Sequence, residues 1–548
     1  MKKKALTLLV AGVALGAAAN DATYSYFKYE GHDSRFDTPI DSGREYYNPI
    51  LAGYYPDPSV TMKGDTYYLV NSSFAFFPGV PIFESKDLVN WHQIGHVLDR
   101  PGQLNLEGHE VSNGIYAPAI TYNPYNDTFY VITTSTGPNG GNFLVKSKDP
   151  HMGWSDPIWL PEIDGIDPSF LFDNDGKAYI VHNAPVFGEP RYEGERAIRL
   201  FEFDPETDRI ISEPLEIVRS GTHVTAQPIW IEGPHLYHIG DYYYLMCAEG
   251  GTEEDHSEVI FRSKNPRGPW EEASINPILT QRDLPEERAN KITSTGHADI
   301  IRTPEGEWWA VFLGCRPYEG NLYNTGRDTY LLPVEWKDGW PVILEKGKAV
   351  TTVGEKEGLA PEAGTLTGNF SYIDTFEDNE LNPRWMFLRN APKEGNSLDG
   401  KSLKLHPGNP LGSKLPMSAL FARQQHPDFT VETEVDFNPQ TETQIAGLVL
   451  LQNEDYNFIF GKTLLNGQPT LVVKRNERGE SLTGTATVPA EGKLKLKVTG
   501  EGRLYSFYYM PEGETEWKTL AADVDGSNLS TAHARGFIGA MIGPYAAF

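Results

Sequence analysis

Three acidic residues occupy similar places in the 548-residue chain and are the first candidates for chemistry. Asp57 and Asp167 each directly precede a proline, and Glu232 precedes one by two positions. An isolated Asp-Pro is usually a turn former, but three acids at matching positions favour a functional role. Carboxyl groups gathered in one cleft raise one another's pKa, and a carboxyl with a raised pKa can donate a proton near neutral pH. We therefore expect these acids to form one functional site, provided that the fold brings them together.

The acids belong to a sequence repeat. Each repeat has a lead-in segment, then a turn of Gly, Asn, Asp or Glu residues roughly seven to nine positions further on, and then an aromatic-rich strand. The strands after the five turns are expected at 66–70, 129–132, 178–181, 242–245 and 308–311. Five units of roughly 50–65 residues predict an all-β fold, with a five-bladed β-propeller over residues 46–345.

A propeller would bring residues together that are far apart in the chain. The innermost strand of each blade lines the central channel, and equivalent positions in repeated blades should lie at equivalent radii. We therefore expect Asp57, Asp167 and Glu232 to converge on one axial cavity from three different blades.

The remaining segments differ in pattern from the repeats. Residues 371–548 include an alternating apolar and polar stretch at 429–435 and a continuous apolar stretch at 446–451. Short strands of this kind, separated by Gly, Asn and Asp turns, predict a β-sandwich domain. Residues 346–370 are expected to form a linker. The polar, Tyr-rich residues 20–45 are expected to form an N-terminal lead that wraps onto the first blade.

The first 19 residues have the pattern of a signal peptide. Three lysines at 2–4 precede an apolar stretch at 6–16, and three alanines at 17–19 offer a cleavage site. The apolar stretch is short for a membrane span, and no later stretch has the pattern of one. We expect an exported protein that is periplasmic or secreted.

Charge and cysteine content restrict the function classes. A net charge of −28 and a pI near 4.9 argue against nucleic acid or an anionic membrane as a partner. The two cysteines, Cys247 and Cys315, are as consistent with buried thiols as with a disulfide. Neither a Cys-x-x-Cys motif nor a His/Cys metal spacing occurs, so we expect no metal and no cofactor.

A series of motifs makes the chain resemble glycoside hydrolase family 43, the β-xylosidase and α-L-arabinofuranosidase family. The resemblance is to the two-domain members, with a five-bladed propeller and a C-terminal sandwich. It covers essentially the whole chain after the first 19 residues, and the joint order of the motifs is more specific than any one of them. The motifs are NPIL at 48–51, YPDPS at 55–59, SSF at 72–74, FPGVPI at 77–82, GIYAP at 114–118, IDPS at 166–169, IEGP at 231–234, GHAD at 296–299, GRDT at 326–329 and FLRN at 387–390.

The resemblance implies a role for each acid. Asp57 matches the general base that activates water, Glu232 the general acid, and Asp167 the carboxylate that orients the acid and tunes its pKa. Enzymes that this chain resembles invert the configuration at the anomeric carbon. Inversion requires two carboxyls about 6.5–9.5 Å apart, with a water between base and sugar. Different blades facing one channel can supply such a gap.

The resemblance also implies four substrate-binding residues near the first two acids. Phe74 and Tyr116 match walls of the sugar subsite. The other two are Ala117, which follows Tyr116, and Ile166, which directly precedes Asp167. Many relatives have Trp in place of Tyr116, and some xylosidases have an aromatic residue in place of Ile166. Both differences alter the pocket and weaken any transfer of xylosidase specificity to this chain.

Arg327 and His297 complete the candidate site. Arg327 is expected to contact the substrate or a carboxylate, with a surface ion pair as the alternative. For Arg316, a role in the site and a role outside it are equally consistent with the sequence. His297 is expected to contact the sugar, with a packed core position or support of an axial ion as alternatives. Some relatives hold calcium near this position, but no oxygen-rich loop surrounds His297. The 539–545 stretch matches the place where the sandwiches of relatives approach the active site.

These observations favour an inverting exo-glycosidase that releases terminal α-L-arabinofuranose from plant cell-wall polysaccharide or oligosaccharides. A β-D-xylosidase, or an enzyme with both activities, is the alternative, because the two sugars present similar hydroxyl patterns to the same acids. A non-catalytic glycan-binding propeller is the alternative from another class. A retaining glycosidase would need its two carboxyls about 5–5.5 Å apart.

Overall fold

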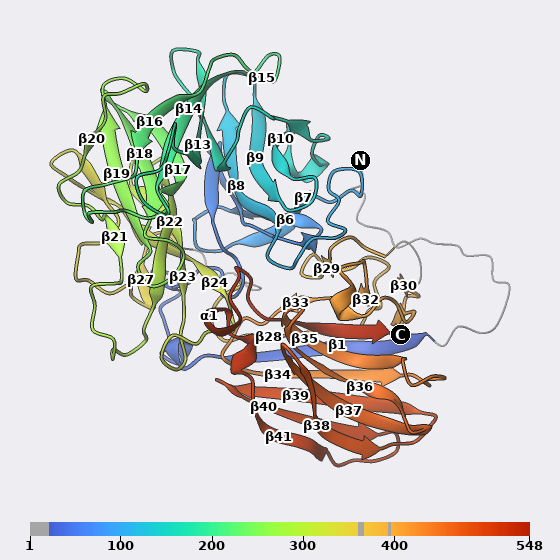
Figure 1. Ribbon diagram of the computed structural model, residues 1–548. Helices are drawn as coiled ribbons and strands as arrows, with labels where there is room; N and C mark the ends of the chain where they lie inside the picture. The colour runs from blue at the N-terminus through green and yellow to red at the C-terminus, as the bar shows by residue number, and fades with distance from the viewer. Residues whose placement is uncertain (1–20, 360–365, 393–395) are drawn as a thin grey trace.

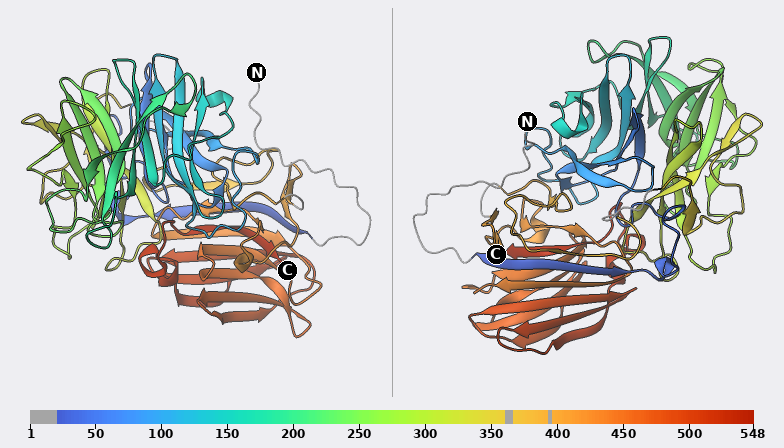
Figure 2. Two further views of the ribbon diagram at one scale, coloured as in Figure 1. Left: turned by 45° about the horizontal axis from the view of Figure 1, so that its top comes forward. Right: turned by 180° about the vertical axis from the view of Figure 1, so that it is seen from behind.

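The computed structural model describes residues 21–359, 366–392 and 396–548, and it is nearly all β (Figure 1). The expected signal peptide at 1–19 lies outside these residues. A five-bladed propeller forms one half of the molecule and a β-sandwich the other, as the views in Figure 2 show. The described ranges contain one α-helix, α1 (Thr531–Ala534), and it is too short to cross a membrane. The expected fold class is therefore confirmed.

Each blade is an antiparallel sheet whose first strand is the innermost, and aromatic and β-branched residues of neighbouring blades pack against each other. Blade I comprises β3 (Ser59–Lys63), β4 (Thr66–Val70), β6 (Gly79–Ser85) and β7 (His92–Leu98). Blade II comprises β8 (Gly114–Asn123), β9 (Thr128–Thr136), β10 (Gly141–Ser147) and β11 (Ile158–Trp159). Blade III comprises β12 (Ile166–Phe172), β13 (Ala178–Pro185), β14 (Arg196–Asp204), β15 (Arg209–Ile210) and β16 (Leu215–Arg219). Blade IV comprises β17 (Glu232–Ile239), β18 (Tyr242–Glu249), β19 (Ser257–Ser263), β20 (Glu271–Glu272) and β21 (Leu279–Thr280). Blade V comprises β22 (Thr293–Arg302), β23 (Trp308–Cys315) and β24 (Arg327–Pro333).

The ring of blades closes through the segment that precedes blade I. Leu51 forms an antiparallel bridge with Thr329 on β24. The side chain of Asn48 donates to the carbonyl of Leu331 and accepts from its N–H, at 2.8 and 3.0 Å. The start of the propeller therefore extends the three-stranded sheet of its last blade, and this contact holds blades I and V together.

The sandwich consists of two antiparallel sheets with a shared apolar core. One sheet contains β30 (Asn396–Leu398), β31 (Leu403–Leu405), β1 (Ala22–His32), β34 (Asp428–Asp436), β39 (Lys493–Glu501), β40 (Leu504–Pro511), β41 (Lys518–Asp525) and β28 (Ser371–Asp374). The other contains β32 (Ser418–Ala419), β33 (Ala422–Arg423), β42 (Met541–Ala547), β35 (Ile445–Asn453), β36 (Tyr456–Leu465), β37 (Gln468–Glu477) and β38 (Glu480–Thr487).

Strand β1, within the expected N-terminal lead at 20–45, belongs to the sandwich, so the expectation that this lead wraps onto the first blade is wrong for Ala22–His32. Strand β1 lies between β31 and β34 and pairs with both. Its apolar side chains, including Tyr24, Phe27 and Tyr29, are buried in the sandwich core. Tyr24 and Phe27 are three positions apart because a bulge follows Tyr24, so the two-residue period of the strand is interrupted and is hard to recognise in the sequence. Further on, β2 (Glu45–Tyr47) pairs with β27 (Val353–Glu355) from the expected linker.

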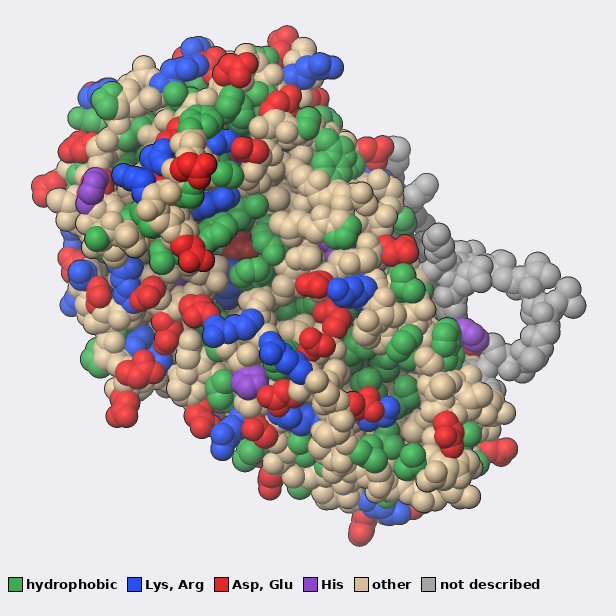
Figure 3. Space-filling view, viewed as in Figure 1, with side chains coloured by type: hydrophobic (Ala, Val, Ile, Leu, Met, Phe, Trp, Pro, Cys, Tyr) green, Lys and Arg blue, Asp and Glu red, His purple; other side chains and the backbone are tan. Residues whose placement is uncertain are grey.

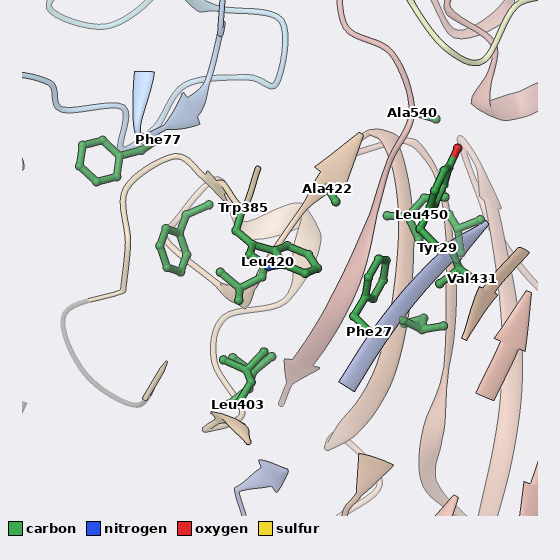
Figure 4. Close-up of a cluster of buried hydrophobic side chains, with 14 of the residues drawn as sticks. Phe27, Tyr29, Phe77, Trp385, Leu403, Leu420, Ala422, Val431, Leu450 and Ala540 are labelled. Atoms are coloured by element: carbon green, nitrogen blue, oxygen red, sulfur yellow. The ribbon is translucent and has the colours of Figure 1, made fainter. Parts of the chain in front are cut away.

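The two domains share buried structure. Strand β29 (Phe387–Leu388) pairs with β5 (Phe76–Phe77) of the propeller. Phe77 belongs to the same buried cluster as Phe27 and Trp385, and Figure 4 shows these side chains with their neighbours. Because one core crosses the boundary, the sandwich has a defined position relative to the propeller.

Candidate active site

Every blade has a residue with left-handed backbone conformation at the start of its inner strand. These residues have φ between 36° and 56° and are Asp57, Ala117, Asp167, Gly233 and His297. In blades II to V a bulge interrupts the pairing at this point. Positive φ is uncommon for residues other than glycine, and a bulge changes the direction of a side chain. The repeat therefore specifies both the strand and the special residue at its axial end.

Glu232 does not occupy the position expected for it. Gly233 is the residue equivalent to Asp57 and Asp167, and Glu232 lies one position earlier, as Tyr116 does in blade II. The expectation of equivalent positions is thus correct for the aspartates and wrong for the glutamate. The N–H of Gly233 donates to Oδ2 of Asp167 at 3.0 Å, so the start of blade IV still adjoins the aspartate of blade III.

Asp57 is buried and surrounded by groups that favour its ionised form. Nη1 of Arg327 donates to Oδ1 at 2.9 Å, and the hydroxyl of Ser72 donates to Oδ2 at 2.6 Å. Burial opposes ionisation, but the Arg327 charge, His297 and the Ser72 hydrogen bond together lower the pKa of Asp57 below its usual value. Ser72 also accepts from the N–H of Ala117 at 2.7 Å, which fixes its hydroxyl.

Asp167 and Glu232 have the opposite electrostatic character. Burial raises the pKa of Asp167 to about 7, and the charge of Asp57 contributes to the rise. Burial also raises the pKa of Glu232 well above its usual value, and the charges of Asp167 and Asp57 raise it further. The site therefore combines one carboxylate held ionised with a neighbouring pair that retains a proton. General acid–base chemistry requires this combination.

Asp57 and Asp167 line a narrow axial channel, and Glu232 directly precedes Gly233, another residue of its lining. The channel is lined by Asp57, Asp167, Ala117, Gly233, His297 and their neighbours, and its volume is about 10 Å³. That volume is close to the minimum for one water molecule, so the channel itself has no room for a larger ligand. Figure 3 shows a hollow in the propeller, with an acidic surface at its bottom and hydrophobic side chains around it.

An aromatic wall borders the acids, and one of its members comes from the sandwich. The ring of Phe74 lies 5.0 Å from that of Tyr116 and 5.8 Å from that of Phe537, and Tyr116 and Phe537 are 5.7 Å apart. The hydroxyl of Tyr116 donates to the carbonyl of Ser112 at 2.7 Å, and the Phe537 N–H donates to the Ser112 hydroxyl at 3.0 Å. Sequence reasoning located Phe74 and Tyr116 but not Phe537.

Close backbone contact explains how the sandwich approaches the propeller here. A Cβ atom on Gly326 would lie 2.7 Å from the Cα of Gly539, so glycine at these positions allows the two backbones to touch. Arg327 follows directly, and its Nη2 donates to the carbonyl of Phe537 at 3.4 Å. Gly539 is the first residue of the 539–545 stretch, which the sequence placed near the active site, and Phe537 precedes that stretch by two residues.

The other expected site residues occupy different places around the acids. His297 lies against the backbone of Gly233, with Nδ1 at 3.8 Å from Oδ1 of Asp57, and burial lowers its pKa to about 4. Ile166 begins β12, is half-buried, and pairs with Asn183. Ser72 is the second residue that sequence reasoning missed as a site residue, although it lies within the SSF motif.

Three further expectations concern metal binding, Arg316 and the two cysteines. Among the described residues, no set of three or more His, Cys, Asp or Glu side chains is arranged to hold a metal ion. Arg316 is buried and pairs with Asp328 and Asp33, so its role is structural. Cys247 and Cys315 are free buried thiols.

Comparison with known proteins agrees with this geometry. Residues 46–341, more than half of the chain, match the family model described as glycosyl hydrolases family 43. The chain belongs to glycosyl hydrolase family 43. Residues 373–547 of this family 43 chain match the β-xylosidase C-terminal concanavalin A-like domain. The protein is therefore a glycoside hydrolase, as expected from the motifs.

Similar proteins extend over both domains of the family 43 chain. It is 36% identical over 519 residues to a non-reducing end α-L-arabinofuranosidase of Bacteroides ovatus, covering 92% of this chain and 91% of that protein. It is 37% identical over 524 residues to a xylosidase/arabinosidase of Butyrivibrio fibrisolvens, covering 91% and 95% of the two chains. The crystal structure of a GH43_12 protein from a capybara gut metagenome superposes with a TM-score of 0.87 and 40% identity, covering 96% of this chain and all of that one.

Proposed function

We propose that this family 43 protein is an inverting exo-glycosidase that releases terminal α-L-arabinofuranose from hemicellulose side chains or oligosaccharides. The observation that carries the proposal is the division of charge among the acids: Asp57 is held ionised, while the pair of Asp167 and Glu232 retains one proton, which Glu232 carries. The wall of Phe74, Tyr116 and Phe537 supports exo action, because Phe74 and Phe537 pack against Arg327, the partner of Asp57, and so close one side of the site.

In the proposed reaction, Asp57 accepts a proton from a water molecule as that water attacks the anomeric carbon. Glu232 donates its proton to the glycosidic oxygen of the leaving group, and the bond from the anomeric carbon to this oxygen breaks. Asp167 keeps Glu232 protonated beforehand, since its negative charge opposes ionisation of the neighbouring carboxyl. Attack from the face opposite the leaving group inverts the configuration. The three carboxyls and water supply every proton transfer, so we expect activity without a metal or cofactor.

The choice of arabinofuranose is supported by the pocket and by the relatives. Tyr116 has its hydroxyl engaged with Ser112, and the aliphatic Ile166 lies beside Asp167. One relative is named an α-L-arabinofuranosidase, and a second is named a xylosidase/arabinosidase. A β-D-xylosidase, or an enzyme with both activities, is the alternative, and other relatives are named β-xylosidases. The segment at 1–19 supports export to the periplasm or medium, where plant cell-wall polysaccharide would be the substrate.

The test is hydrolysis of aryl α-L-arabinofuranoside and aryl β-D-xyloside by the wild type and by Asp57→Ala, with Asp65→Ala, an acid on an exposed turn, as the control. We expect arabinose release that Asp57→Ala abolishes and Asp65→Ala preserves. NMR of the first product should show inverted anomeric configuration. Preferential xylose release would support the alternative sugar. Binding of glycan without turnover of either substrate would instead support a glycan-binding propeller, and retained configuration would support a retaining glycosidase.

A further inference from the structure

An exposed apolar patch lies next to the acid of blade IV. Ile229 is 46% exposed and Trp230 is 38% exposed, although large apolar side chains are usually buried. Trp230 precedes Glu232 by two residues, and the Cβ position of Gly194 lies against the side chains of Ile229 and Trp230. The patch therefore lies on the segment that leads into β17, the strand that begins with Glu232.

The backbone of Trp230 is strained, and hydrogen bonds on both sides hold it in place. Its φ is 51°, in the left-handed region that a bulky side chain rarely adopts. The Trp230 N–H donates to the carbonyl of Gly194 at 3.1 Å, and the Ile229 carbonyl accepts from Gly250 at 2.9 Å. Strain of this kind persists only where the surroundings enforce it, and it is concentrated at functional sites.

One face of the Trp230 indole is supported by a charged network. The guanidinium carbon of Arg196 lies 4.7 Å from the ring centroid. Arg196 donates to Oδ1 of Asn183 through Nε and Nη2 at 3.2 and 2.7 Å, and Nδ2 of Asn183 donates to the carbonyl of Ile231 at 2.6 Å. The indole is therefore held against the residues that position Glu232, and part of its surface remains exposed to solvent.

The chemistry of the site determines which part of a substrate this surface would meet. In the proposed function the base lies on the water side of the anomeric carbon, and the acid lies on the side of the leaving group. Trp230 adjoins the acid, whereas the wall of Phe74, Tyr116 and Phe537 adjoins Asp57 through Arg327. The ring is thus on the leaving-group side of the site.

We infer that Trp230 is a specificity-determining residue that binds the first sugar of the leaving group by stacking its indole on the apolar face of that sugar. The ligand class is a carbohydrate chain, and the inference rests on the proposed function. An aromatic platform that Arg196 already holds in place binds a pyranose ring with little loss of conformational entropy. The enzyme should therefore favour substrates whose leaving group is itself a sugar.

The test compares two substrates with the same terminal sugar. One is an oligosaccharide, and the other is the corresponding methyl glycoside, whose leaving group also needs the proton of Glu232 but is too small to touch Trp230. For Trp230→Ala we expect kcat/KM on the oligosaccharide to fall about 3- to 10-fold, with kcat/KM on the methyl glycoside unchanged. Trp230→Phe keeps an aromatic face and should recover most of the loss. Trp159→Ala, at a tryptophan that is 50% exposed on the outermost strand of blade II, is the matched control and should change neither value.

Equal losses on both substrates would overturn the inference, because they would show that Trp230 acts only by positioning Glu232. Unchanged activity on both substrates, or a loss on the oligosaccharide that Trp159→Ala reproduces, would overturn it as well. In these cases the wild type still hydrolyses both substrates, and the proposed function stands. If the wild type hydrolyses neither substrate, both the proposed function and the inference fail.

Discussion

Nη1 of Arg327 donates to Oδ1 of Asp57 at 2.9 Å, and this bond joins the last strand of the propeller to the entry of its first blade. The two residues are separated by 270 positions in the chain. They meet because the Leu51–Thr329 bridge closes the ring of blades. The ionisation of Asp57 therefore depends on the closure of the propeller.

Replacement of Arg327 by alanine should shift the acid limb of the activity profile. Asp57 accepts a proton only when ionised, so activity rises with pH through its pKa. Loss of the guanidinium removes the largest contribution that lowers this pKa, and the pKa therefore rises. We expect the acid limb of kcat/KM to move upward by about 1 to 3 pH units. The measurement is kcat/KM against pH on an aryl glycoside.

Arg327→Lys provides the matched comparison, because it keeps the positive charge but has a different donor geometry. Its acid limb should lie between those of the wild type and Arg327→Ala. An unchanged acid limb in the alanine variant would contradict the assignment of Asp57 as the base.

Asp167→Asn should shift the opposite limb. Glu232 donates its proton only while protonated, so activity falls as the pH rises through its pKa. The Asp167 charge raises that pKa, and its removal should lower it. We expect the alkaline limb of kcat/KM to move downward by about one pH unit or more, together with a fall in kcat. If the limb stayed in place while kcat fell, Asp167 would act only by orienting the acid.

Phe537→Ala tests whether the sandwich contributes to catalysis. The ring of Phe537 packs on Phe74 and Tyr116, and its backbone contacts Arg327. Its loss should lower kcat/KM about tenfold, because the aromatic wall loses a member and the terminal sugar is less well held. Phe548→Ala, at an exposed position in the same domain, is the control. Equal activity of the two variants would restrict the sandwich to a structural role.

Arg316→Met tests the boundary between the domains. Arg316 is buried and pairs with Asp33, at the end of β1, and with Asp328 on β24. Its removal leaves two buried carboxylates without their main partner, so we expect the free energy of unfolding to fall by about 3–5 kcal/mol. Thermal or denaturant unfolding measures this change. Arg44→Met, which breaks an exposed pair with Glu357, should cost less than about 1 kcal/mol. A similar small change for both variants would contradict the prediction.

The sequence by itself determined the propeller, the sandwich and the identity of the acids. Turns, strand periods and Asp-Pro motifs are local features, and the repetition of a local unit five times specifies a ring of blades. The same repetition located Asp57 and Asp167 at equivalent axial positions, and the structure confirms this. The local pattern of β1 was present too, but its partners β31 and β34 lie hundreds of residues away, so nothing local assigned it to the sandwich.

Only the tertiary structure decided how these parts meet. The one-residue displacement of Glu232, the pairing of Arg327 with Asp57 and the packing of Phe537 against Phe74 all depend on contacts between distant segments. Such contacts are set by the closure of the ring, the bulges at the axial ends of the strands and the buried core shared by the two domains. Sequence periodicity encodes which residues pair within a blade. The pKa of each acid depends instead on burial and on charges that other blades supply, and these exist only in the folded chain.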